Sequence, residues 1–204
     1  MTALSFGLLC FSSLFTVIDP VAAAPIFVSL THGKDARKIA LRACAVALAV
    51  LALFAVSGAL VFRIFGITLD AFRIGGGIVF LTIGLPMMTG HSKKEVEPQS
   101  EHDPSVVPLG VPLLAGPGAI TTVMVLMGQA RGAMHAAALL FALVLALFAT
   151  FVSLAIAPTI LRRLGPSNLV LLTKVMGLIV VVLGVQLVLD GIKPVVLDIV
   201  RAAH

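Results

Sequence analysis

Apolar residues occupy most of the chain in six long runs, and short polar stretches separate these runs. The runs cover roughly residues 4–30, 40–62, 70–90, 106–129, 133–161 and 168–190. A helix needs about 20 apolar residues to cross the hydrocarbon core of a bilayer, and each run reaches that length. The pattern therefore predicts an all-α integral membrane protein with six transmembrane helices.

Composition supports this class. Of the 204 residues, 60% are hydrophobic and 11% are charged, whereas a soluble domain is closer to half apolar and a quarter charged. The formal net charge of +5 does not indicate nucleic-acid binding, because the basic residues lie in short connections between apolar runs. Residues 1–204 are thus expected to form a single transmembrane domain.

Two of the apolar runs are interrupted in the same way. Asp19-Pro20 lies inside the first run, and Gly116-Pro117 lies inside the fourth. Aspartate and proline suit the N-cap and first position of a helix, and proline after glycine suits a new helix start. The sequence predicts that helices 1 and 4 are broken at these points. Interrupted segments in corresponding halves indicate the binding site of a transporter.

The two halves also resemble each other elsewhere. Residues 73–79 and 174–180 both read basic, β-branched, any residue, Gly, any residue, Ile, Val. A unit of three spans ends on the side of the membrane opposite to its start, so a second copy that follows it directly has the inverted orientation. We expect a 3+3 inverted-topology repeat, with repeat one at about 4–90, a mobile loop at about 91–105 and repeat two at about 106–190.

Lysine and arginine predict the orientation. The connections after runs 1, 3 and 5 hold nine basic residues, and the opposite side holds five. The nine are Lys34, Arg37, Lys38, Arg42, Lys93, Lys94, Arg162, Arg163 and Lys174, and the five are Arg63, Arg73, Arg131, Lys193 and Arg201. The positive-inside rule then places both termini outside the cytoplasm.

Each break exposes the start of a half-helix, where backbone N–H groups lack partners and the helix dipole is positive. Such an end can bind an anion, for example the carboxylate of an amino acid. Small residues near the breaks leave room for a small substrate, and threonines in the first turn offer hydroxyl donors. The candidate substrate-binding residues are Asp19, Pro20, Ala23, Gly116, Pro117, Gly118, Thr121 and Thr122.

Asp19 has two interpretations. It caps its own half-helix, or it also binds the substrate ammonium group or a coupling cation, Na⁺ or H⁺. Acids at membrane depth are functional by default, which favours the second interpretation. The residues considered as facing the cavity are Arg73, Gly76, Gly77, Lys174 and Gln186. For the two cations the simpler role is to extend toward the headgroups, for the glycines it is close helix packing, and for the glutamine it is interhelical hydrogen bonding.

No metal-ligand spacing, nucleophile motif or nucleotide-binding motif is present, so we expect neither an enzyme nor a bound cofactor. Cys10 and Cys44 form no CxxC pair. A membrane thiol oxidoreductase would want a cysteine beside each break, and Cys10 lies well before the first. An exporter of another small solute or metal ion, and a structural membrane protein, are two further classes to weigh against a carrier. Whether the chain forms a homo-oligomer stays open.

The motifs around the breaks resemble those of the MarC family of bacterial inner-membrane proteins. The resemblance rests on Asp19-Pro20 with residues 25–31, on residues 71–77, and above all on the run from Pro112 to Thr122. Met176-Gly177-Leu178 and Val185-Gln186 also resemble the family's last span. The family belongs to the lysine-exporter superfamily, and some members are described as six-span carriers of glycine, alanine and other small neutral amino acids. The resemblance implies a multi-pass protein of the bacterial plasma membrane.

Overall fold

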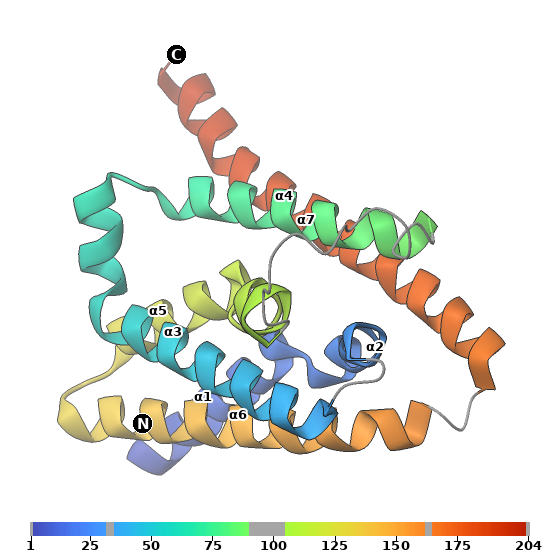
Figure 1. Ribbon diagram of the computed structural model, residues 1–204. Coiled ribbons are helices and arrows are strands. Elements are labelled where there is room, and N and C mark those ends of the chain that lie inside the picture. The colour runs from blue at the N-terminus through green and yellow to red at the C-terminus, as the bar shows by residue number, and fades with distance from the viewer. Residues whose placement is uncertain (1, 32–34, 90–104, 162–164, 203–204) are drawn as a thin grey trace.

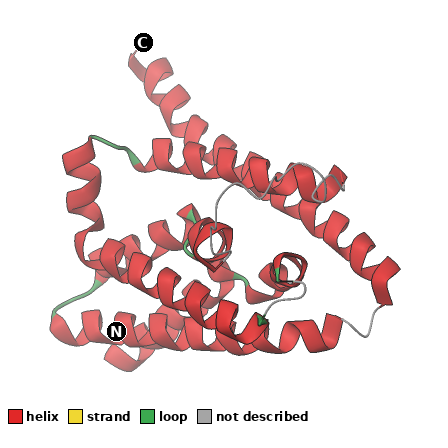
Figure 2. Cartoon of the chain, viewed as in Figure 1, coloured by secondary structure: helices red, strands yellow, loops and turns green. Residues whose placement is uncertain are grey.

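The computed structural model describes residues 2–31, 35–89, 105–161 and 165–202, and every regular element in these ranges is a helix (Figure 2). The elements are α1 (Ala3–Ile18), α2 (Pro20–Leu30), α3 (Ala36–Phe65), α4 (Leu69–Thr89), the π-helix η1 (Ser105–Leu114), α5 (Pro117–Gln129), α6 (Ala133–Leu161) and α7 (Gly165–Ala202). All but one residue of the predicted loop at 91–105 lie outside the described residues.

Five segments of the described chain are long and apolar enough to cross a membrane. They are Ala3–Val28, Ala36–Phe65, Leu69–Thr89, Ala133–Leu161 and Val170–Leu197. The predicted fourth span, 106–129, is absent from this set because the chain divides it into η1 and α5, of 10 and 13 residues. The all-helical membrane class is therefore confirmed, and the count of six spans is not.

Local sequence explains most helix ends. Asp35 caps α3 by accepting the backbone N–H of Lys38 at 3.3 Å, and Gly66 ends the same helix in the left-handed conformation, φ +62°. Helix α7 runs 12 residues beyond the predicted boundary at 190, because the charged residues there do not break a helix. Pro194 is accommodated inside it.

The helices form two groups with a third set between them (Figure 1). Helices α4 and α7 lie side by side along their length and make the most extensive contact in the molecule. The second group comprises α1, α3 and α6, and the short elements α2, η1 and α5 lie between the groups. Both breaks therefore lie between the two groups of long helices.

Contacts between the halves come in matching pairs. Helices α1 and α2 pack on α6, while η1 and α5 pack on α3. Likewise α2 contacts α7, and α5 contacts α4. Each half of the chain thus packs mainly on the other half, and the two patterns mirror each other.

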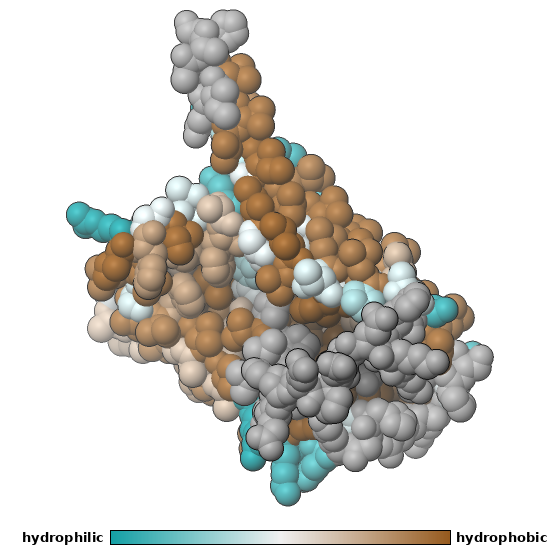
Figure 3. Space-filling view, turned by 45° about the horizontal axis from the view of Figure 1, so that its top comes forward, coloured by the Kyte–Doolittle hydropathy of each residue, from teal (hydrophilic) through white to brown (hydrophobic). Residues whose placement is uncertain are grey.

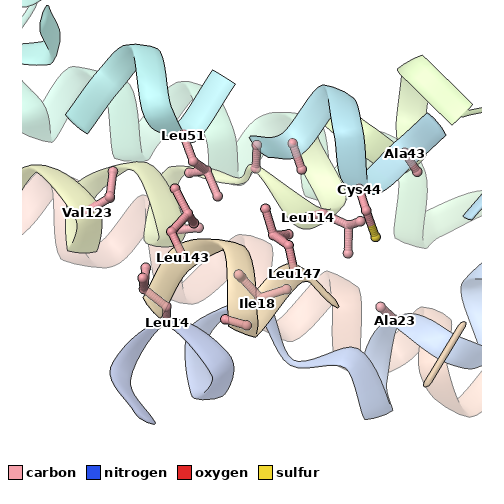
Figure 4. Packing of buried hydrophobic residues seen from close by; sticks show 14 of the residues in the cluster. Leu14, Ile18, Ala23, Ala43, Cys44, Leu51, Leu114, Val123, Leu143 and Leu147 are labelled. Atoms are coloured by element: carbon pink, nitrogen blue, oxygen red, sulfur yellow. The ribbon is translucent and has the colours of Figure 1, made fainter. Parts of the chain in front are cut away.

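The main apolar core lies among the broken elements and the α1, α3 and α6 group (Figure 4). Leu14 and Ile18 from α1, Leu51 from α3, and Leu143 and Leu147 from α6 converge there. The central stretch of α3 is rich in alanine, which allows neighbouring backbones to approach closely. This core fixes the position of both breaks.

Helices α4 and α7 approach closely through glycines spaced seven residues apart. A Cβ added at Gly77 would lie 2.5 Å from the carbonyl oxygen of Gly184, and one added at Gly84 would lie 2.9 Å from that of Gly177. A Cβ at Gly191 would lie 2.6 Å from the carbonyl oxygen of Asp70. The two antiparallel helices therefore share one tightly packed register.

The outer surface is mostly apolar. In the view of Figure 3, hydrophobic residues cover the long helices and hydrophilic residues are confined to small areas. Large side chains such as Val56, Phe141 and Phe148 face outward at more than half of their full exposure. Such a surface would be unfavourable in water and suits contact with lipid.

Candidate functional site

Asp19 forms the first break by itself. Its backbone N–H bonds the carbonyl of Phe15 at 3.1 Å and ends α1, while its carboxylate accepts the N–H of Ala22 at 3.1 Å and begins α2. It has φ +44°, and it is the only residue other than glycine with positive φ in the part of the chain that the structure describes. Aspartate tolerates this left-handed conformation better than most residues, so a single aspartate makes the turn and caps the next helix.

Gly116 forms the second break in a different way. It precedes Pro117 at the N-cap of α5 with no side-chain hydrogen bond to the helix start. The N–H of Ile120 bonds the carbonyl of Gly116 at 3.0 Å. The N–H groups of Gly118 and Ala119, in the first turn, have no carbonyl of their own helix to bond. This helix start is uncapped and carries the positive end of the helix dipole.

Both breaks line one cavity of about 230 Å³. Its walls come from α1 and α2, from the end of η1 and start of α5, and from the facing sides of α4 and α7. The lining residues are Val17, Ile18, Asp19, Ala22, Ala23, Ile26, Phe80, Leu113, Leu114, Gly116, Gly118, Ala119, Met176, Ile179, Val180, Leu183, Gln186 and Leu187. Among the residues that the structure describes, only Asp19 and Gln186 bring polar side chains to it. The described polar groups are therefore a carboxylate, an amide and the exposed backbone at the breaks.

The structure brings together four of the predicted substrate-binding residues, Asp19, Ala23, Gly116 and Gly118. The two prolines are buried beside the cavity and shape the turns without lining it. Thr121 donates its hydroxyl to the carbonyl of Pro117 at 2.6 Å, within its own helix.

Three further candidate residues lie outside this cavity. Thr122 lines a separate open hollow with residues of α1. Gly76 allows the ring of Pro117 to pack against α4, because a Cβ at Gly76 would overlap that ring. Gly77 serves the contact with α7 described above. The two glycines therefore position the second break and the α4–α7 pair.

The two candidate cations are also placed elsewhere. Arg73 forms an ion pair with Asp70 at 3.0 Å, and it lines a different hollow. Lys174 is exposed on α7 and is not among the residues that line the cavity. Gln186 does line it, and its side chain donates to the carboxylate of Asp190 at 2.9 Å.

Sequence reasoning did not identify the apolar wall that α4 and α7 supply. Phe80, Met176 and Val180 look like any other lipid-facing or packing residue of a span, so no sequence signal separates them. The hydrogen bond between Gln186 and Asp190 could have been predicted from the sequence, because residues four apart in a helix lie on one face.

The cysteines stand apart from this site. Cys10 is buried in α1 and Cys44 is buried in α3. Neither of them lines the cavity at the breaks. The lining of the cavity therefore contains no thiol pair that could carry out redox chemistry.

Comparison with known proteins places this geometry in a family context. Residues 4–196 match the sequence profile of the MarC family integral membrane proteins. A UPF0056 membrane protein of Methanocaldococcus jannaschii is 38% identical, over 93% of this chain and 97% of its own length. UPF0056 membrane proteins of Aquifex aeolicus (92% of this chain, 94% of its own) and of Bacillus subtilis, YvbG (93% and 95%), are 37% and 34% identical. No solved structure matches the chain.

Proposed function

Because the chain belongs to the MarC family of integral membrane proteins, we propose that it is a secondary carrier of small neutral amino acids such as glycine and alanine. One observation carries the proposal: a carboxylate and an uncapped helix start line the same otherwise apolar cavity. These two groups are complementary to the two charges of an α-amino acid.

Asp19 supplies the anionic side of this site. One carboxylate oxygen caps α2, and a carboxylate has further lone pairs with which to accept an ammonium hydrogen. The start of α5 supplies the cationic side through the N–H groups of Gly118 and Ala119. In our proposal the substrate ammonium lies against Asp19 and its carboxylate against the start of α5.

The remaining walls argue for a small, uncharged substrate side chain. Val17, Ile26, Leu183 and other apolar residues surround the polar groups, and burying an unpaired charge against them would be costly. The cavity of about 230 Å³ is below the range of about 300–1,000 Å³ typical of sites for drug-sized ligands. Size and polarity together favour glycine, alanine and similar solutes.

The arrangement of helices suggests how the site would alternate between the two sides. The cavity lies between the α4–α7 pair and the broken elements, and the pair is held together by close glycine contacts. We propose that this pair moves as a unit against the α1, α3 and α6 group. Such rocking of one unit against another is the usual basis of alternating access.

The matching contacts between the halves support a 3+3 inverted repeat. In that arrangement η1 and α5 form the fourth of six spans, broken at Gly116. In such a repeat Gly77 would correspond to Gly177, and Gly84 to Gly184. This correspondence converts the contact between Gly77 and Gly184 into the contact between Gly177 and Gly84. This register differs by one residue from the alignment of residues 73–79 with 174–180.

We further propose that Na⁺ or H⁺ binds Asp19 and that the gradient of this ion drives transport, with no other cofactor. The proposed location is the plasma membrane with both termini outside the cytoplasm, which follows from the positive-inside rule if the protein has six spans. The transported solute and the ion are the partners that this function requires.

Ligand-induced stabilisation of the purified full-length protein tests the proposal. A ligand that binds only the folded state at 100 times its Kd stabilises that state by about 2.7 kcal/mol. Glycine and alanine should raise the unfolding temperature saturably, whereas lysine and glutamate should not, and the effect should depend on Na⁺ or on pH. A folded protein that no neutral amino acid stabilises under any of these conditions would contradict the proposal.

A further inference from the structure

A second, charged hollow of about 480 Å³ lies beside the cavity, where the start of α4 meets the last third of α7. We define the charged hollow by its lining residues, Arg73, Leu187, Asp190, Lys193, Pro194, Leu197 and Arg201. Asp190 and Lys193 lie in the last two turns of the last apolar span, which ends at Leu197, and Arg201 lies beyond its end. The charged hollow is therefore at one edge of the membrane-spanning region.

The charged hollow and the cavity share a wall. Leu187 lines both of them. One residue earlier, Gln186 lines the cavity and donates to the Asp190 carboxylate of the charged hollow at 2.9 Å. A single turn of α7 thus separates the cavity at the breaks from the charged hollow.

Basic side chains predominate in the charged hollow. Arg73, Lys193 and Arg201 contribute three cations, against the one lining carboxylate of Asp190. Lys193 pairs with Asp190 at 3.4 Å, and Arg73 pairs with Asp70 at 3.0 Å. Among the side chains that the structure describes, Arg201 forms no salt bridge, so the described groups leave an excess of positive charge.

We propose that the charged hollow is the entrance through which a solute with a carboxylate reaches the cavity, and that Leu187 closes the passage between them. This inference rests on the proposed carrier function. The cations would attract the solute carboxylate and raise its local concentration at the entrance. The hydrogen bond from Gln186 to Asp190 would hold the Leu187 turn of α7 in its closed position.

A basic hollow at the membrane edge also suits an anionic lipid headgroup. The shared Leu187 wall favours the solute, because a lipid site would have no reason to adjoin an internal cavity. A lipid occupant is nevertheless one outcome that the experiment must detect. Vesicles made only of phosphatidylcholine remove that occupant from the measurement.

Cysteine modification tests the entrance without any substrate. Leu187→Cys and, at the outer side, Leu197→Cys would be made in the full-length protein and reconstituted in phosphatidylcholine vesicles at low ionic strength. Each variant would be treated with two methanethiosulfonate reagents of similar size, one with a sulfonate and one with a trimethylammonium group. The wild type supplies the background, since Cys10 and Cys44 are 0% and 7% exposed.

Each rate is first divided by the rate of the same reagent with a small free thiol in solution. By this normalised ratio we expect the anionic reagent to react faster than the cationic one by about sevenfold, as a positive potential of about one kT per unit charge would produce. Arg201→Gln, and Arg73→Gln or Lys193→Gln, should lower this ratio toward one. Arg63→Gln is the matched control, because Arg63 is at the end of α3 on the same side of the molecule but does not line the charged hollow. It should leave the ratio unchanged.

A ratio near one at both cysteines, or a ratio that the lining substitutions do not lower, would overturn the entrance. So would a ratio that anionic lipid lowers further in the protein with Arg201 than in Arg201→Gln, because the membrane surface potential acts on both and the additional fall would report lipid in the charged hollow. Amino acid binding is measured separately on the same variants. If the anionic reagent reacts faster as expected but no amino acid binds, the carrier function is wrong. If amino acids bind but the two reagents react equally fast, only the entrance is wrong.

Discussion

Gly77 and Gly184 bring the backbones of α4 and α7 so close that a Cβ added at Gly77 would lie 2.5 Å from the carbonyl oxygen of Gly184. The opposing atom belongs to the backbone, so it cannot move aside as the end of a flexible side chain could. The register repeats seven residues away, where Gly84 meets Gly177. The close contact is therefore a property of the whole helix pair, and it gives the pair the rigidity that our transport proposal requires.

We expect Gly77→Ala to destabilise the protein by about 1–3 kcal/mol, the usual cost of overpacking a closely packed contact. The measurement is the thermal unfolding midpoint in detergent. Gly75→Ala is the matched control, because nothing lies within 4 Å of a Cβ at Gly75. Alanine there should be neutral or stabilising by up to about 1 kcal/mol, because it forms helices better than glycine. Equal midpoints for the two variants would contradict the close packing.

Two substitutions at Asp19 separate its structural role from its proposed binding role. Asp19→Asn retains a capping oxygen and tolerates the left-handed backbone, so the free energy of unfolding should change by less than about 0.5 kcal/mol. It removes the charge that would pair with the substrate ammonium. Because a hydrogen bond to a charged group contributes about 1.5–3 kcal/mol, binding of glycine or alanine should weaken by about tenfold to a hundredfold.

Asp19→Ala should lose both roles. Removing the cap costs about 0.5–2 kcal/mol, and the left-handed conformation costs alanine roughly 1–2 kcal/mol more. Calorimetric binding and thermal unfolding on the same preparations distinguish the two variants. If Asp19→Asn bound amino acids as tightly as wild type, the carboxylate charge would have no part in binding. If Asp19→Ala were as stable as wild type, the Asp19 side chain would not stabilise the break.

Gly118 offers a test of substrate size. It lines the cavity, and a Cβ there would lie 3.2 Å from Cγ1 of Val17 on the other side of the breaks. Gly118→Ala should narrow the cavity and weaken binding of alanine more than binding of glycine, by about threefold to tenfold, since a methyl group is worth roughly 1 kcal/mol. Gly128→Ala, near the other end of α5 with nothing within 4 Å, is the control. Unchanged binding of both ligands would place Gly118 outside the site, and an equal loss for both would mean that the added methyl group does not meet the substrate side chain.

The sequence predicted where the chain leaves the helical conformation, and physical reasons explain that success. Aspartate before proline, and glycine before proline, are local signals that do not depend on the rest of the fold. The predicted run at 133–161 coincides with α6, whose ends are marked by Gly132 and by polar residues. Local chemistry therefore located the breaks and the α6 boundaries.

The sequence could not predict which residues of the unbroken helices face the cavity. Thr121 illustrates the difficulty, because its hydroxyl bonds the carbonyl of Pro117 in its own helix and offers no free donor. Phe80 and Val180 reach the cavity only because α4 and α7 pack in one register. Such contacts depend on distant parts of the chain. For the same reason the π-helix η1 could not be anticipated from its composition.

Asp35 gives a test of local stability that depends on pH. Its carboxylate accepts the backbone N–H of Lys38 at the start of α3, and this hydrogen bond lowers its pKa from the ordinary value of 3.8. A lowered pKa means that the folded state favours the ionised form. The stabilisation is complete above the ordinary pKa and is lost as the pH falls through the lowered pKa. We expect Asp35→Asn, which keeps a capping oxygen that does not titrate, to flatten this part of the pH profile.

The measurement is the difference in unfolding midpoint between wild type and Asp35→Asn from pH 7 down to pH 3. The wild type should lose its advantage over the variant as the pH falls below about 4, because protonation removes the charge at the positive end of the helix dipole. Asp35→Ala should be less stable than Asp35→Asn throughout, since it lacks the capping oxygen. A difference between wild type and Asp35→Asn that stays constant over the whole range would mean that the Asp35 carboxylate does not stabilise the start of α3 through its charge.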